Sequence, residues 1–172
     1  QVQNQLGLDK VYLMPTYLPP HVDEKKTISS EHRLAMLELA VADNPCLDIE
    51  PIELIRKGKS YTYDTMKALK EANPDTDYYF IIGGDMVEYL PKWHRIDDLL
   101  HLVQFVGIRR PNYPTESTYP IIWVDVPQMA ISSTLIRQKV KSGCSTRYLL
   151  PENVINYIQE KGLYQDELDN KL

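Results

Sequence analysis

The sequence predicts an α/β fold in which helices cover both faces of a doubly wound, mostly parallel sheet. Short apolar runs alternate with amphipathic stretches along the chain, and each apolar run is nearly continuous. Such runs are typical of parallel strands, because helices bury both faces of a parallel sheet. The length of 172 residues, with 43% hydrophobic and 25% charged residues, suits one globular domain with a substantial core.

Five segments have the composition of buried strands. The clearest covers residues 78–82, which are aromatic or β-branched on both faces. The second along the chain is less regular, because Leu47, Ile49 and Ile52 alternate while Pro51 indicates an edge strand. The predicted strands are residues 11–14, 47–52, 78–82, 103–108 and 121–126.

Amphipathic stretches between these segments predict helices. Leu34, Leu37 and Val41 share one face of the stretch 30–43, and Glu31 lies in its first turn. Further helices are predicted at residues 63–71, with Thr62 as the N-cap and Asn73-Pro74 at the end, and at residues 151–161, ended by Gly162.

Composition and charge limit the possible partners. A net charge of −5, without a basic patch, predicts no nucleic-acid partner. The longest apolar neighbourhood, residues 99–108, is too short to span a bilayer, so we expect no membrane association. Cys46 and Cys144 have neither disulfide nor metal-ligand spacing. With no signal peptide recognised, we expect a cytoplasmic protein.

The chain shows no internal repeat and no low-complexity linker. We therefore expect a single domain over residues 1–164, followed by a polar, acidic tail at residues 165–172. The oligomeric state stays open at this stage, with a homo-oligomer as one possibility.

Three hydroxyl side chains, Ser132, Ser133 and Thr134, follow the last predicted strand where a helix is expected to begin. A helix start offers backbone N–H groups without intrahelical acceptors and the positive end of the helix dipole, so it can bind an anion. Arg137, one turn later, can close on a phosphate with its planar guanidinium. The alternative is an ordinary N-cap, where Ser and Thr are favoured anyway.

A second group of polar residues follows the clearest strand. Gly83 and Gly84 allow close approach of a ligand to the backbone, and the Asp85 carboxylate can accept hydrogen bonds from ribose hydroxyls. The alternative is a tight strand-to-helix turn with Asp85 as the N-cap.

Tyr89 and Trp93 come next along the chain. Trp93 lies between Lys92 and His94, which disfavours full burial, and its indole can stack on a flat ring. It could equally be a half-buried packing residue of a loop. The four histidines have no ligand spacing and no serine lies on a nucleophile elbow, so neither a metal site nor a serine nucleophile is predicted.

Six motifs occur in an order that resembles bacterial nicotinate mononucleotide adenylyltransferases, from the first residues to about Tyr164. The motif at residues 131–137 alone fits any nucleotidyltransferase related to class I tRNA synthetases, whereas residues 60–62 and 91–93 resemble the nicotinate branch. The motifs are residues 11–15 with 19–21, then 59–65, 81–85, 90–93, 109–111 and 131–137.

This resemblance implies a Rossmann-like nucleotidyltransferase fold and transfer of AMP from ATP to nicotinate mononucleotide. Pyrophosphate would leave, and the product would be nicotinate adenine dinucleotide, a precursor of NAD. Mg²⁺ is expected to accompany ATP, held by phosphates and water.

The resemblance also implies roles for individual residues. Arg137 and Ser133 would be catalytic, and His21 would belong to a substrate loop. ATP would be bound by Gly83, Asp85, Ser132, Ser133, Thr134 and Arg137, and nicotinate by Thr62, Tyr89 and Trp93.

The sequence departs from the family pattern at three places. Val22 stands where the family has a lysine, and Gly84 stands where alanine is usual. The family's opening strand and its histidine-containing phosphate loop would precede Gln1, so the principal catalytic histidines are expected upstream of this residue.

The missing opening strand has a structural consequence. In a doubly wound sheet of this type it would lie between the strands at residues 11–14 and 78–82. We therefore expect another segment to fill that position, with these two strands roughly 9–10 Å apart rather than hydrogen-bonded to each other.

Two alternatives remain open from the sequence. A related adenylyltransferase could use nicotinamide mononucleotide or pantetheine phosphate, although pantetheine has no ring to stack on Trp93. A non-catalytic nucleotide-binding module is the alternative from another class.

Overall fold

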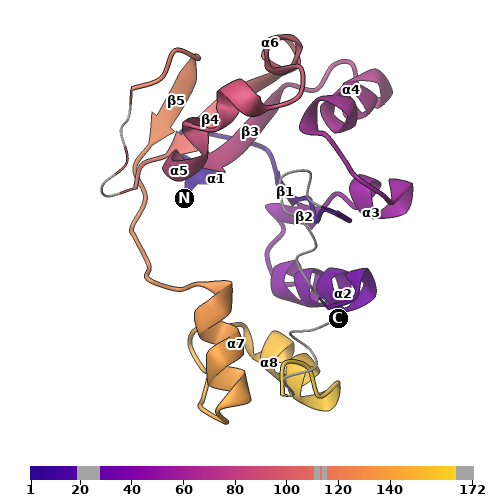
Figure 1. The fold of residues 1–172 in the computed structure, drawn as a ribbon, viewed down its shortest axis with the longest axis vertical. Helices are drawn as coiled ribbons and strands as arrows, with labels where there is room; N and C mark the ends of the chain where they lie inside the picture. Colours follow the sequence, from indigo (N-terminus) through magenta and orange to yellow (C-terminus); the bar gives the residue numbers. More distant parts are fainter. Residues whose placement is uncertain (19–27, 111–112, 114–115, 166–172) are drawn as a thin grey trace. The chain divides into compact units, whose positions relative to one another are not determined.

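The computed structural model describes residues 1–18, 28–110, 113 and 116–165 (Figure 1). These residues belong to two compact units, which are treated separately. Unit 1 comprises Gln1–Leu8 and Lys57–Gln128, and unit 2 comprises Asp9–Arg56 and Met129–Leu172. The single domain expected over residues 1–164 stays a prediction.

Unit 1 is built on a three-stranded parallel sheet of order β3-β4-β5. Gly83 pairs with Ile108, and Ile108 pairs with Val124, so the three strands end side by side. The strands are β3 (Tyr78–Gly83), β4 (Val103–Ile108) and β5 (Ile121–Val124). The sequence predicts all three, and β5 ends two residues before the expected boundary.

Helices cover both faces of this sheet, as a doubly wound arrangement requires (Figure 1). On one face, Val2 of α1 packs with Val106 and Val124. On the other face, Phe105 packs in a cluster with residues of the remaining helices, such as Met66 and Leu99. The helices are α1 (Val2–Leu6), α4 (Thr62–Ala72), α5 (Gly84–Val87), α6 (Ile96–Leu99) and the 3₁₀ helix η1 (Leu90–Lys92).

In its described residues, unit 2 combines a two-stranded parallel sheet with four helices. Its core joins α2 to α8, where Met36 and Leu39 pack against Val154 and Ile158. The elements are β1 (Val11–Leu13), α2 (Ser30–Val41), β2 (Leu47–Ile49), α3 (Ile52–Arg56), α7 (Ser133–Lys141) and α8 (Glu152–Glu160). The α/β class with parallel strands is thus confirmed in both units.

Two predictions about element boundaries are wrong. Ile52 does not extend β2 but begins α3. The carbonyl oxygen of Pro51 accepts the first helical hydrogen bond, from Ile55 N–H, and proline has no N–H group to donate to a neighbouring strand. Thr62 is the first residue of α4 rather than its N-cap, which is Tyr61.

The helix α2 packs on more than one neighbour. Met36, Leu39 and Ala40 contact the α8 cluster, and α2 also contacts β2. Leu34, Leu37 and Val41, which were expected to share one face, are half-buried. The helix is half-buried on several sides, so its apolar residues do not mark a single face. At the other end of the chain, Gly162 has a φ of 62° and follows α8, as its predicted role in ending that helix requires.

Among the described strands, β1 pairs with β2 and β3 pairs with β4, and the two sheets are separate. The strands β1 and β3 belong to different units. The expected spacing of these two strands stays a prediction. None of the described helices has the length and apolarity that a membrane span requires.

Gly107 in β4 tests how tightly the core of unit 1 is packed. A Cβ atom at this position would lie 2.7 Å from Trp123 Cζ3 and 2.8 Å from Ile121 Cγ2. Gly107→Ala is therefore expected to lower the free energy of unfolding by about 1–3 kcal/mol, as overpacking does. Urea unfolding measures the change. In a Trp123→Leu background the same substitution should cost less, and an equal cost in both backgrounds would contradict the steric explanation.

Candidate active site

The carboxyl edge of the β3-β4-β5 sheet gathers charged side chains from segments distant in the sequence. Asp85 lies in the first turn of α5, directly after β3, and Arg110 follows β4. Arg110 Nη1 lies 3.5 Å from Asp85 Oδ1, which makes an ion pair. Asp85 Oδ1 is buried and has no hydrogen-bond partner in the structure, so this contact is ionic without a formed hydrogen bond.

Gly83 permits this arrangement. A Cβ atom at residue 83 would collide with the Asp85 carboxylate and lie 3.3 Å from Arg110 Nε. The backbone at Gly83 has φ −71° and ψ 150°, which any residue adopts, so space rather than backbone conformation requires glycine here. Gly83 is also the N-cap of α5, and the alternative of Asp85 as the N-cap is wrong.

Gly84 begins α5 in close contact with the backbone of β4. A Cβ atom on Gly84 would lie 3.0 Å from the carbonyl oxygen of Ile108. An alanine here, usual in the family that the sequence resembles, would require a small shift of these two segments.

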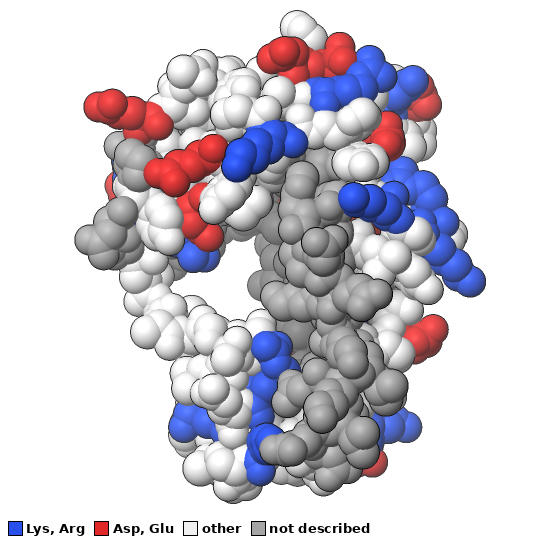
Figure 2. Space-filling model, viewed as in Figure 1, with Lys and Arg blue, Asp and Glu red and all other residues white. Residues whose placement is uncertain are grey.

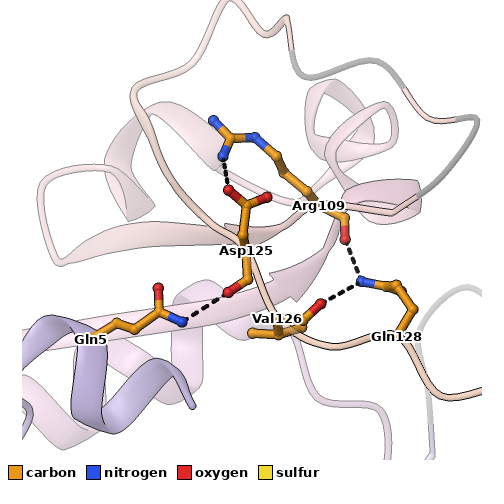
Figure 3. Close-up of polar contacts among 5 residues, drawn as sticks. All are labelled: Gln5, Arg109, Asp125, Val126 and Gln128. Atoms are coloured by element: carbon orange, nitrogen blue, oxygen red, sulfur yellow. Dashed lines mark hydrogen bonds and ion pairs between the residues drawn. The ribbon is translucent and has the colours of Figure 1, made fainter.

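A second polar cluster at the same edge involves the ends of β4 and β5 (Figure 3). Arg109 Nη1 donates to Asp125 Oδ2 at 2.8 Å, and Gln128 Nε2 donates to the carbonyl oxygen of Arg109 at 2.8 Å. Gln5, which lies in α1, donates a hydrogen bond from Nε2 to the carbonyl oxygen of Asp125 at 2.8 Å. These bonds fix the loop that leaves β5.

From the sequence alone, neither Arg110 nor Asp125 was expected to have a role in the site. Arg110 lies in a motif of the resemblance, and Asp125 lies within the expected strand. The signal that could have found both is their position after or at the ends of neighbouring parallel strands, where polar residues meet at one edge.

Trp93 is half-buried, as expected from its charged neighbours. Its ring packs edge-to-face on Phe80, with centroids 5.8 Å apart and an interplanar angle of 90°, and on Phe105 at 5.9 Å and 73°. The Trp93 Nε1 atom is buried and has no hydrogen-bond partner in the structure. Trp93 therefore also has the packing role that the sequence left open.

Tyr89 and Thr62 lie in the same unit as Trp93. Tyr89 is 52% exposed, and Lys92 Nζ lies 5.3 Å from its ring centroid. Thr62 is half-buried, and as the first residue of α4 it presents a backbone N–H group with no acceptor inside the helix.

Unit 2 contains the hydroxyl motif at the start of α7. Ser132 is the N-cap, and its Oγ accepts a hydrogen bond from Leu135 N–H at 3.1 Å. Arg137 Nη2 lies 3.3 Å from Thr134 Oγ1, so the guanidinium is turned back toward the first turn of the helix. Ser133 and Thr134 are exposed. The N-cap alternative is thus correct for Ser132, while the other groups stay accessible at the positive end of the helix.

His21 and Val22 lie outside the described residues. Within the part of the chain that the structure describes, no cluster of three or more His, Cys, Asp or Glu side chains could hold a metal ion. Acidic and basic side chains are interspersed on the face that Figure 2 shows. Elsewhere in the structure, the hydrogen bond from Lys10 lowers the pKa of Asp48, and backbone and serine hydrogen bonds lower the pKa of Glu31.

The chain resembles known proteins along most of its length. The sequence profile of the cytidylyltransferase-like family matches residues 1–139. A relative from Streptococcus mutans, named "Probable nicotinate-nucleotide adenylyltransferase", is 61% identical over 165 residues, which are 96% of this chain and 79% of the relative. A Streptococcus pneumoniae relative with the same name is 62% identical over 164 residues, 95% of this chain and 78% of the relative.

Solved structures share the fold at low sequence identity. The Plasmodium falciparum nicotinic acid mononucleotide adenylyltransferase, complexed with NaAD, has a TM-score of 0.75 and 17% identity, covering 97% of this chain and 88% of that chain. The same protein complexed with APC has a TM-score of 0.74 and 16% identity over the same shares. These similarities extend the α/β fold to the whole described chain.

The N-cap of α7 can be tested apart from any ligand. Ser132→Ala removes the acceptor of Leu135 N–H and is expected to lower the free energy of unfolding by about 1 kcal/mol. Ser133→Ala is the matched control, because its side chain has no part in this cap, and a change within about 0.5 kcal/mol is expected. Urea unfolding of both variants measures the difference, and equal losses would contradict the assignment of Ser132 as the cap.

Proposed function

The chain belongs to the cytidylyltransferase-like family and, within it, to the nicotinate-nucleotide adenylyltransferases, and we propose that it transfers AMP from ATP to nicotinate mononucleotide. The products are nicotinate adenine dinucleotide and pyrophosphate, in the biosynthesis of NAD. The observation that carries this proposal is the 61–62% identity to the streptococcal relatives over at least 95% of the chain. The polar groups at the carboxyl edge of a parallel sheet support it independently.

The chemistry is a single displacement. A phosphate oxygen of nicotinate mononucleotide forms a bond to the α-phosphorus of ATP, and the bond from that phosphorus to the bridging oxygen of pyrophosphate breaks. No covalent bond to the protein is needed. Catalysis then consists of aligning the attacking and leaving oxygens and stabilising the negative charge that grows on the leaving group.

For the triphosphate, we propose the start of α7. Ser132, Ser133 and Thr134 supply hydroxyl donors, and the first-turn N–H groups supply the positive end of the dipole. The Ser132 hydroxyl can still donate, since capping uses it only as an acceptor. Arg137, already oriented toward this turn by Thr134, neutralises the leaving group, and Ser133 supplies a further hydroxyl donor to it.

For the nucleoside and the acceptor, we propose groups of unit 1. Asp85 accepts hydrogen bonds from ribose hydroxyls, and Gly83, which has no side chain, leaves room for the Asp85 carboxylate and Arg110 beside it. Thr62 donates to the nicotinate carboxylate. Trp93 supplies a face for the nicotinate ring, with Tyr89 beside it.

Mg²⁺ fits this site as a companion of ATP rather than as a resident ion. Asp85 and Asp125 face Arg110 and Arg109, and no cluster of metal ligands occurs among the described residues. An ion held by phosphate oxygens and water needs no such cluster, and it would reduce the charge of the triphosphate.

Substrate preference follows from the charge of the acceptor. A carboxylate accepts charge-assisted hydrogen bonds from Thr62, whereas the NH₂ group of nicotinamide would face the same donors. We expect kcat/KM for nicotinate mononucleotide to exceed that for nicotinamide mononucleotide by about tenfold or more, since each lost charge-assisted bond costs roughly 1.5 kcal/mol. Pyrophosphate release with ATP and each mononucleotide measures the ratio.

The same assay distinguishes the alternatives. Comparable kcat/KM values for both mononucleotides would contradict the proposed recognition of the carboxylate. Turnover of pantetheine phosphate alone would identify another adenylyltransferase, and no pyrophosphate with any acceptor would favour a non-catalytic nucleotide-binding protein.

Two substitutions separate the proposed pockets. Trp93→Ala should raise KM for nicotinate mononucleotide roughly tenfold with little change in KM for ATP, because stacking is lost only at the ring. Arg137→Ala should instead lower kcat/KM for ATP by about 10²-fold, because the leaving group loses its counter-charge.

Arg147→Ala is the charge-matched control for Arg137, because Arg147 is an exposed arginine of the same unit that faces the Tyr148 ring. Its kinetics should equal those of the unaltered protein. If Trp93→Ala raised only KM for ATP, the assignment of both pockets would be wrong.

A further inference from the structure

Two contacts of aromatic rings join the segment that carries Thr62 to the segment that carries Trp93. The rings of Tyr61 and His94 have centroids 4.6 Å apart and an interplanar angle of 38°. The guanidinium carbon of Arg95 lies 4.1 Å from the ring centroid of Tyr63. All of these residues belong to unit 1, whose internal geometry the structure describes.

The two contacts differ in their surroundings. Tyr63 is a buried member of the hydrophobic core, so its contact with Arg95 is part of general packing. His94 is exposed and Tyr61 is half-buried, and neither belongs to the core cluster. The Tyr61–His94 contact therefore buries little apolar surface, and a contribution to folding does not account for it.

Its position in the chain suggests what it fixes. Tyr61 directly precedes Thr62, and His94 directly follows Trp93. Consecutive Cα atoms are only about 3.8 Å apart, so fixing the two rings limits the positions of both neighbours. Lys59 Nζ lies 5.7 Å from the Tyr61 ring centroid and adds a cation–π contact to this pair of rings.

The segment after η1 needs such a constraint. Trp93 is extended, with ψ 138°, and Arg95 has φ 53°, so the chain reverses between η1 and α6. A non-glycine residue in the left-handed region is unfavourable on its own. The indole Nε1 atom of Trp93 has no hydrogen-bond acceptor in the structure, so the ring is oriented from within by packing against the core, including edge contacts with Phe80 and Phe105.

We propose that Tyr61 and His94 are positioning residues, which hold the Trp93 ring at the distance from Thr62 that the nicotinate moiety requires. This inference rests on the proposed function, because it concerns the site of the acceptor substrate. Neither residue needs to touch the substrate. The contact acts on binding of the mononucleotide and leaves the ATP groups and the chemical step unchanged.

His94→Ala and His94→Phe test this proposal in the whole protein. Loss of the ring pair should raise KM for nicotinate mononucleotide roughly threefold to tenfold, while kcat and KM for ATP change by less than about twofold. His94→Phe keeps a ring at this place and should restore KM. Because His94 is exposed, both variants should unfold at the temperature of the unaltered protein.

Binding without turnover provides a second readout. Trp93 and Trp123 are the only tryptophans, so in a Trp123→Phe background the fluorescence reports on Trp93. Titration with nicotinate mononucleotide should give a Kd that rises with His94→Ala and returns with His94→Phe. His101→Ala is the matched control, since His101 is an exposed histidine of the same unit near the end of α6.

An unchanged KM and Kd in His94→Ala would overturn the proposal, and so would an equal increase in both substrates' KM values. Failure of His94→Phe to restore binding would overturn it as well, because a ring contact would then not be the cause. Failure of the proposed function has a different signature: the unaltered protein would release no pyrophosphate from ATP with nicotinate mononucleotide.

Discussion

The parallel register of β3, β4 and β5 is the constraint on which the candidate site of unit 1 depends. Because Gly83, Ile108 and Val124 are neighbours across the sheet, the residues that follow them leave from the same edge. An antiparallel β4 would send Arg109 and Arg110 to the opposite edge, away from Asp85. Phe105 and Val106, which are almost fully buried, anchor the central strand and with it the position of this edge.

At this edge the carboxylates of Asp85 and Asp125 each face an arginine. The two ion pairs are therefore neutral, although the whole chain has a net charge of −5. Such half-exposed ion pairs contribute only about 0–1 kcal/mol to stability, so their main consequence is geometric. Asp125 is held by a short hydrogen bond from Arg109, whereas Asp85 lies 3.5 Å from Arg110 without one. Asp85 Oδ1 therefore keeps unused acceptor capacity, but this atom is buried, so the ribose contact proposed for Asp85 would fall to its other carboxylate oxygen.

The sequence predicts the buried strands well, because an apolar, β-branched run has few other places in a folded chain than the interior of a sheet. Its errors are local. The position of Ile52 is compatible both with the alternating pattern of a strand and with the start of a helix. The hydrogen bond from Ile55 N–H to the carbonyl oxygen of Pro51 shows that a helix begins there. Thr62 could be the N-cap of a helix or its first residue, since the apolar residues that follow have the same helical spacing in both cases.

Contacts between distant segments are a different case. The Asp85–Arg110 pair depends on which strand lies beside β3, and the Tyr61–His94 contact depends on how the chain turns after η1. Neither spacing appears in the sequence, because residues 61 and 94 belong to no common periodic pattern. Residues of a motif can thus be proposed as site residues from the sequence, whereas residues that act through a contact with a distant segment can be proposed only once the fold is known.

At the start of α7, the structural role of the motif is compatible with the triphosphate contact proposed for it. A hydroxyl group has one donor and two acceptor positions, and capping by Ser132 uses an acceptor position only. An anion requires donors, so the cap and the ligand do not compete for the same group. The same separation holds for Arg137, whose contact with Thr134 orients the guanidinium while most of its N–H donors stay available. A favourable N-cap composition is therefore no argument against phosphate binding at this helix.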